Sequence, residues 1–94
     1  MRNYELMVIF DPEIDERAVT PAMEKFLAPV KEGEGTYELD VWGSRRLAYE
    51  INKRTEGVYV VTTMTATSDQ AQEVDRQLRL SETVLRTKLI RKDA

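Results

Sequence analysis

The spacing of the apolar residues alternates between a strand period and a helix period, and this alternation constrains the fold more than any other feature. Residues 4–10 are apolar on both of their alternating faces, which is typical of a strand at the centre of a sheet. The β-branched run of residues 58–66 has the composition of a second strand. A stripe with helical spacing follows each of them: Val19, Met23, Phe26, Leu27 and Val30 in the first case, and Ala71, Val74 and Leu78 in the second.

Two further extended segments complete the pattern. Residues 36–49 are predicted to form one long strand that bends at Gly43, because glycine accommodates a bulge. Residues 52–57 form a polar turn before the β-branched run, and residues 84–90 form the last strand. The order strand, helix, strand, strand, helix, strand predicts an α+β, ferredoxin-like βαββαβ fold. It consists of a four-stranded antiparallel sheet with two helices on one face.

In this arrangement the first and third strands lie in the middle of the sheet and are expected to run parallel. The second and fourth strands form the edges. Both edge strands are rich in Arg and Lys, which hinder pairing with foreign strands. Residues 1–94 are expected to form a single domain, as is usual for a chain of this length.

The ends of the helices are marked by residues that cap or interrupt helices. Asp15 or Thr20 caps the first helix, and in the second case the following proline takes the first helical position. Pro29 is expected to kink or shorten the last turn. Thr67 and Gln70 have the spacing of a capping box and place the start of the second helix.

The composition argues against catalysis and against a metal or cofactor site. The chain contains no Cys and no His, so disulfides, thiol nucleophiles and the commonest metal ligands are absent. A group of acidic residues lies near the end of the first strand: Glu5, Asp11, Glu13, Asp15 and Glu16. Such a group can bind a hard cation or perform acid–base chemistry, but it lacks the spacing of a calcium loop. Helix capping and solubility explain it better.

Nothing in the sequence predicts a targeting signal or a membrane span. The longest apolar run, Leu6–Phe10, is far too short to cross a bilayer, and the first residues do not resemble a signal peptide. The protein is therefore expected to be cytoplasmic.

The stretch from Trp42 to Tyr49 has the most unusual composition and also marks a change of charge. Residues 1–42 carry ten acidic and four basic side chains, net −6, whereas residues 43–94 carry seven acidic and ten basic ones, net +3. Arg45 and Arg46 either protect an edge strand against aggregation or belong to an interface. Trp42 either fills the end of the core or stays exposed beside the arginines as an interface anchor.

A second group of cations lies in the last strand and beyond it. The strand period places Arg86 and Lys88 on the face of the sheet that the helices do not cover, and Arg2 on the neighbouring first strand could join them. Arg91 and Lys92 follow at the end of the strand. These cations are either a solvated surface or a group directed at phosphates.

The same strand and helix order occurs in RNA-recognition motifs, whose third strand carries stacking aromatic residues. Residues 56–63 keep the glycine and one valine of that pattern but lack its aromatic residues. A sequence-specific reader of single strands is therefore disfavoured, and any RNA is expected to be bound through backbone charge and shape.

Three segments together resemble the bacterial small-subunit ribosomal protein S6 family. They are Met1–Glu5, Val84–Lys88 and the more specific central motif Trp42–Ile51, which contains Gly-Ser-Arg-Arg-Leu-Ala-Tyr-Glu-Ile. The resemblance extends over essentially the whole chain, and the Trp-Gly pair and Pro21 resemble actinobacterial members.

The resemblance implies a structural role on the platform of the small ribosomal subunit. It also implies a heterodimer with the small, basic ribosomal protein S18 and joint binding to the central domain of the small-subunit ribosomal RNA. By the same resemblance, the partner interface comprises Asp40, Val41, Trp42, Arg45 and Arg46, and the RNA contacts comprise Arg2, Arg86, Lys88, Arg91 and Lys92.

A different class of function remains open at this point. Ferredoxin-like modules also serve as regulatory domains that self-associate and bind small molecules. The sequence contains no glycine-rich or polar constellation that predicts such a pocket.

Overall fold

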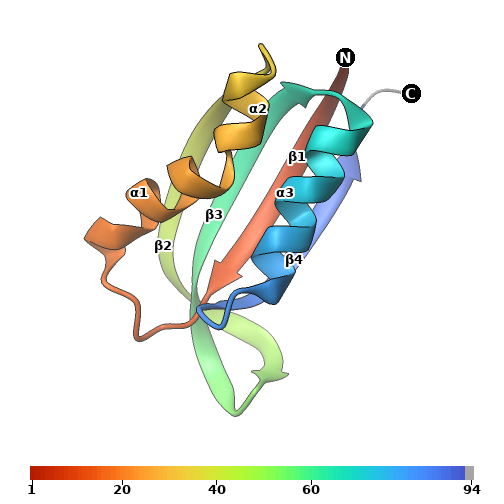
Figure 1. Ribbon diagram of the computed structural model, residues 1–94. Helices are drawn as coiled ribbons and strands as arrows, with labels where there is room; N and C mark the ends of the chain where they lie inside the picture. The colour runs from red at the N-terminus through yellow and green to blue at the C-terminus, as the bar shows by residue number, and fades with distance from the viewer. Residues whose placement is uncertain (93–94) are drawn as a thin grey trace.

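The strands form one sheet in the order β2-β3-β1-β4, and the helices cover one of its faces in the computed structural model, which describes residues 1–92 (Figure 1). The elements in chain order are β1 (Arg2–Phe10), α1 (Glu16–Phe26), α2 (Ala28–Glu32), β2 (Thr36–Ile51), β3 (Arg54–Ala66), α3 (Ser68–Leu80) and β4 (Val84–Arg91). This architecture confirms the predicted α+β, ferredoxin-like fold, with β1 and β3 in the middle and β2 and β4 at the edges.

The expected parallel orientation of the first and third strands is wrong. β1 pairs antiparallel with β3, with Met7 opposite Val61 and Phe10 opposite Val58. The helical crossover after β1 carries the chain back to the end of the sheet at which β1 began, so β1 and β2 share one direction. The tight β2–β3 hairpin then reverses the chain, and β3 therefore runs against β1.

The first predicted helix is two helices in the structure. Asp15 caps α1 by accepting a hydrogen bond at Oδ1 from the backbone N–H of Arg17 (2.9 Å), so Thr20 is not the cap and Pro21 lies inside the helix. α1 ends at Phe26, Leu27 caps it, and α2 begins at Ala28 with Pro29 in its first turn. Proline has no N–H to continue the hydrogen-bond ladder of α1, and the interruption falls where Pro29 was expected to cause it.

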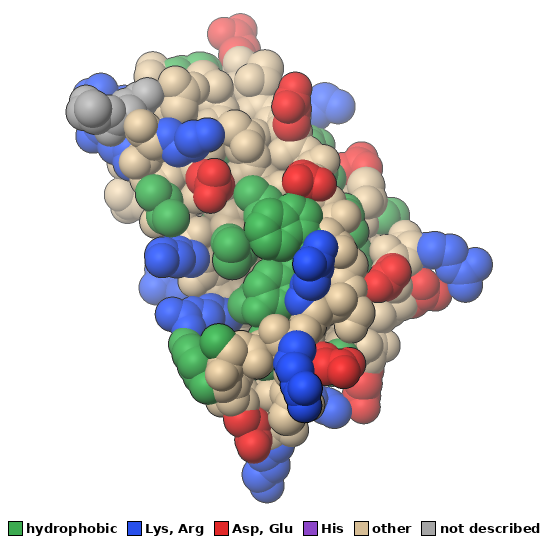
Figure 2. All heavy atoms as spheres, turned by 180° about the vertical axis from the view of Figure 1, so that it is seen from behind, with side chains coloured by type: hydrophobic (Ala, Val, Ile, Leu, Met, Phe, Trp, Pro, Cys, Tyr) green, Lys and Arg blue, Asp and Glu red, His purple; other side chains and the backbone are tan. Residues whose placement is uncertain are grey.

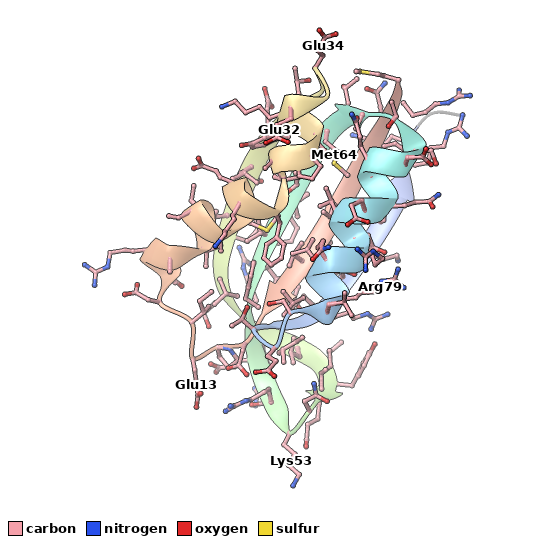
Figure 3. All side chains as sticks on the ribbon, viewed as in Figure 1. Glu13, Glu32, Glu34, Lys53, Met64 and Arg79 are labelled. Atoms are coloured by element: carbon pink, nitrogen blue, oxygen red, sulfur yellow. The ribbon has the colours of Figure 1, made fainter. Side chains whose placement is uncertain are left out.

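The core lies between the sheet and the helices. β1 and β3 contribute alternate residues to it, including Leu6, Phe10 and Met64. α1 and α2 together bury most of the first predicted stripe against them, and α3 buries the second. Figure 3 shows Met64 pointing from the sheet toward the helices. Burial of these side chains supplies the main driving force for folding.

The β2–β3 turn is shorter than the sequence suggested. Ile51 already pairs with Arg54, so the connection consists of Asn52 and Lys53 alone, both with positive φ (49° and 66°), and Lys53 marks the tip of the hairpin (Figure 3). Positive φ at both positions is typical of a two-residue hairpin turn that matches the twist of the strands. Residues 54–57, predicted to belong to the turn, instead begin β3.

The start of α3 depends on the predicted capping box, which the structure confirms. The Thr67 hydroxyl accepts a hydrogen bond from the backbone N–H of Gln70 (3.2 Å), and the Gln70 side chain accepts one from the backbone N–H of Thr67 (3.0 Å). These bonds satisfy two backbone donors that otherwise have no partner inside the helix.

We expect Thr67→Ala to lower the free energy of unfolding by about 1 kcal/mol, because it removes the acceptor of the capping box. Urea denaturation followed by circular dichroism measures this change. Gln72→Ala, an exposed substitution on the same helix, is the control and should change stability by less than about 0.5 kcal/mol. Equal effects of the two substitutions would contradict the role of the cap.

Candidate protein and RNA interfaces

The bend predicted at Gly43 is a β-bulge. Val41 pairs with Val60 and Gly43 pairs with Tyr59, so the register shifts and Trp42 has no residue opposite it. Gly43 has a φ of +82°, which side chains other than glycine rarely adopt. The Glu16 side chain, at the start of α1, accepts a hydrogen bond from the backbone N–H of Ser44 (3.2 Å) and ties the bulge to the helix layer.

The bulge places Trp42 on the open face of the sheet, which is the face that the helices do not cover. Its ring stacks on Tyr59 with centroids 6.4 Å apart and ring planes within 4° of parallel. Its Nε1 donates a hydrogen bond to Asp40 (2.9 Å), and the Arg45 guanidinium lies 5.6 Å from the ring centroid. Trp42 remains 43% exposed, so of the two interpretations of the sequence the exposed one is correct.

The five residues assigned to a protein partner follow one another along the outer edge of the sheet. Asp40, Trp42 and Arg45 contact one another through the hydrogen bond and the cation–π contact. Val41 and Arg46 are exposed on either side of the bulge. This is a surface with an aromatic anchor, an adjacent guanidinium and an unpaired strand edge, which is a composition that suits a protein interface.

The cations assigned to RNA fall into two groups. Arg86 and Lys88 lie on the open face, opposite Ile9 and Met7 of β1. Arg2 does not join them, because its register partner on β3, Ala66, is buried on the helix side.

The second group lies at the other end of β4, near the chain ends. Arg91 pairs with Tyr4, which is also buried on the helix side, and the backbone N–H of Lys92 donates to the Asn3 carbonyl (2.8 Å). Arg2 belongs to this end of the sheet as well. The cations therefore lie at two separate positions, one on the open face of β4 and one at the ends of β1 and β4, and not in the single cluster that the sequence suggested.

The sequence did not reveal a hollow of about 350 Å³ on the open face. The end of the β2–β3 hairpin contributes one side of it and β4 the other, with lining residues Met7, Ile9, Leu47, Ala48, Tyr49, Ile51, Tyr59, Arg86, Thr87 and Lys88. Figure 2 shows this face, with hydrophobic side chains near its middle and Lys and Arg side chains on both sides of them. The sequence contains one signal for this hollow. Beyond the bend, apolar residues occupy every second position, at Leu47, Tyr49 and Ile51.

Asp11, Glu13 and Asp15, near the end of β1, have structural partners. Hydrogen bonds from the backbone N–H and the side chain of Arg17 hold the pKa of Asp15 below its usual value. The Arg54 guanidinium pairs with Asp11 and Glu13, each at 3.4 Å. Within residues 1–92, no three acidic side chains are arranged so that they could hold a metal ion.

An ion pair on α3 lowers the pKa of another acidic side chain. Hydrogen bonds from the Arg76 side chain, and then from Gln77, lower the pKa of Glu73 to about 2. Both groups are on the helix surface, away from the bulge and the hollow. Among the helices of the described part of the chain, none is both long and apolar enough to cross a membrane.

Residues 3–91 match the protein family described as Ribosomal protein S6. The chain belongs to the ribosomal protein S6 family. A relative from Beutenbergia cavernae, named Small ribosomal subunit protein bS6, is 64% identical to it over 95 residues, which cover 100% of this chain and 99% of that protein. A protein of the same name from Acidothermus cellulolyticus is 54% identical, with the same coverage. The resemblance to actinobacterial members of the family is thereby confirmed.

A crystal structure of another S6 protein has the same fold. The crystal structure of 30S ribosomal protein S6 from Thermotoga maritima superposes with a TM-score of 0.85 at 28% identity, covering 97% of this chain and 87% of that one. The fold that positions the bulged edge strand and the cationic edge of this chain is therefore that of the S6 family.

We expect Gly43→Ala to lower the free energy of unfolding by about 1–2 kcal/mol, because a Cβ disfavours the positive φ of the bulge. The nearest atom to that Cβ, Glu16 Oε1, would be 3.4 Å away, so strain in the backbone and not a clash is the cause. Gly43→Asn should be less destabilising, since Asn tolerates positive φ better. Thermal and urea denaturation measure both changes, and an Ala variant as stable as the unaltered protein would contradict this explanation of the bulge.

Proposed function

We propose that this protein is a non-enzymatic structural component of the small ribosomal subunit. In this role it binds the central domain of the small-subunit ribosomal RNA as a heterodimer with ribosomal protein S18. The observation that carries the proposal is the match to the S6 family along residues 3–91, with relatives named as small-subunit proteins. The same role makes the protein cytoplasmic and ribosome-associated.

The surface along the outer edge of β2 is the proposed site for S18. It exposes Trp42 and holds Arg45 against the ring, so a rigid aromatic anchor and a guanidinium are already in place before a partner arrives. Rigid anchors of this kind lose little conformational entropy on binding and often contribute most of the binding energy. The unpaired edge of β2 offers further backbone hydrogen bonds.

The cations of β4 and of the chain ends are the proposed RNA contacts. A protein with a net charge of −3 gains little from long-range attraction to RNA. Pairing with a basic partner first adds phosphate contacts, and the cations on the opposite edge then add a few more. Because these cations lie on β4 and at the chain ends, away from the proposed partner site on β2, both can bind at once.

A regulatory ligand-binding module is the alternative from another class. It is less well supported, because the match to ribosomal proteins extends over the whole chain rather than over a shared fold alone. Purification of the protein with its cellular partners separates the two functions. Co-migration with small ribosomal subunits supports the proposal, and a homodimer that retains a metabolite contradicts it.

The double substitution Arg45→Ala with Arg46→Ala is expected to weaken the affinity for S18 at least about tenfold, because it removes both guanidinium groups from the proposed interface. The free energy of unfolding should change by less than about 1 kcal/mol, since both residues are exposed. Calorimetric titration with purified S18 gives the affinity.

A matched control removes the same charge elsewhere. Arg76→Ala with Arg79→Ala alters two exposed arginines of α3 and should leave the affinity for S18 within about twofold. If the Arg45 and Arg46 variant kept full affinity, β2 would not be the partner site.

Substitution of Arg86 and Lys88 by alanine is expected to leave S18 pairing intact and to weaken RNA binding by the heterodimer. The slope of log affinity against log salt should fall in magnitude by about one for each phosphate that the protein no longer neutralises. Filter binding at several salt concentrations measures it. An unchanged slope would remove these two residues from the RNA interface.

A further inference from the structure

The hollow on the open face combines an apolar floor with a cationic margin. Ile9 and Leu47 are almost fully buried there, although both lie on the side of the sheet away from the helices. Tyr49 and Tyr59 add two aromatic rings to the lining. The end of the hairpin thus forms a small second apolar site opposite the main core.

Charge is distributed unevenly around this hollow. Arg86 and Lys88 belong to the lining, and none of the described residues that line it carries a carboxylate. The Arg86 guanidinium lies 5.7 Å from the centroid of the Tyr49 ring, so a cation and an aromatic ring meet at the same side. An occupant with a flat apolar surface and a negative charge next to it would satisfy both features.

We propose that the hollow binds one unpaired nucleotide of RNA, with its base against Tyr49 and Tyr59 and its phosphate on Arg86 and Lys88. This inference rests on the proposed function, because it specifies which element of the RNA the open face contacts. The base is held by stacking, while its polar edges remain directed to the open mouth of the hollow. Such contacts tolerate any base, as in other single-strand binding sites.

The same features make a protein side chain a poorer occupant. The proposed protein partner is basic, and a basic segment that entered the hollow would meet Arg86 and Lys88. A nucleotide meets the same cations with a phosphate. Tyr59 lines the hollow and also stacks on Trp42 of the proposed partner surface, so the partner and the RNA would contact adjacent parts of one face.

The first test uses the heterodimer with S18 and the central-domain RNA. Tyr49→Ala should weaken RNA binding about tenfold, because one base no longer stacks on the protein. The slope of log affinity against log salt concentration should stay unchanged, because Arg86 and Lys88 still contact the phosphate. Tyr49 is 59% exposed, so its removal is compatible with folding.

Two variants serve as controls. Tyr49→Phe retains the ring and should bind RNA within about twofold of the unaltered protein. Ile90→Ala removes an exposed apolar side chain on β4 that does not line the hollow. This variant should also bind RNA within about twofold of the unaltered protein.

A second test uses the chain alone and separates the base from the phosphate. The probes are hexauridylate and an abasic ribose-phosphate chain of equal length, and the readout is the NMR shift of methyl groups. The methyls of Met7, Ile9 and Ile51 should shift with hexauridylate and not with the abasic chain. Met23, which is buried beneath the helices, provides the internal reference.

The outcomes distinguish this inference from the proposed function. A heterodimer that does not bind the RNA at all overturns both. Unchanged RNA binding by Tyr49→Ala overturns the nucleotide site alone, and so do equal methyl shifts with both probes. If Tyr49→Ala weakens S18 binding but leaves the RNA affinity of the formed heterodimer intact, the hollow belongs to the protein partner and the inference is wrong.

Discussion

The antiparallel pairing of β1 with β3 determines both faces of this molecule. Nine consecutive residue pairs join these strands, from Arg2 opposite Ala66 to Phe10 opposite Val58. Because strand side chains alternate, a shift by one residue would exchange the two faces. The helix side would then lose Phe10 from the core, and the open face would lose Ile9 and Tyr59. The hydrophobic core and the proposed RNA surface therefore depend on one register.

The fold was predictable because its signals are periodic and local. A run that is apolar on both faces placed β1, a β-branched composition placed β3, and the two helical stripes placed the covering layer. The capping box at Thr67 was also readable, since its hydrogen bonds join residues three apart. The direction of β1 relative to β3 was misjudged, although it follows from the predicted order of crossover and hairpin. The length of the β2–β3 turn was not readable, because it depends on positive φ at Asn52 and Lys53.

The candidate sites were predictable to different degrees for the same physical reason. The bulge followed from Gly43 beside Trp42, which are neighbours in the chain. The hollow joins Tyr49 to Arg86, which lie 37 positions apart in the sequence and meet only because the hairpin end bends over the sheet. The separation of Arg2 from Arg86 likewise depends on which face each strand position occupies, and that is a property of the register.

The stack of Trp42 on Tyr59 has a practical consequence. The chain contains a single tryptophan, and the bulge places it at the boundary between the edge of β2 and the open face. Because its indole is partly hydrated and lies close to a guanidinium, its emission wavelength depends on the local polarity and charge. Intrinsic fluorescence can thus report in real time, without a label, when another macromolecule covers this part of the surface.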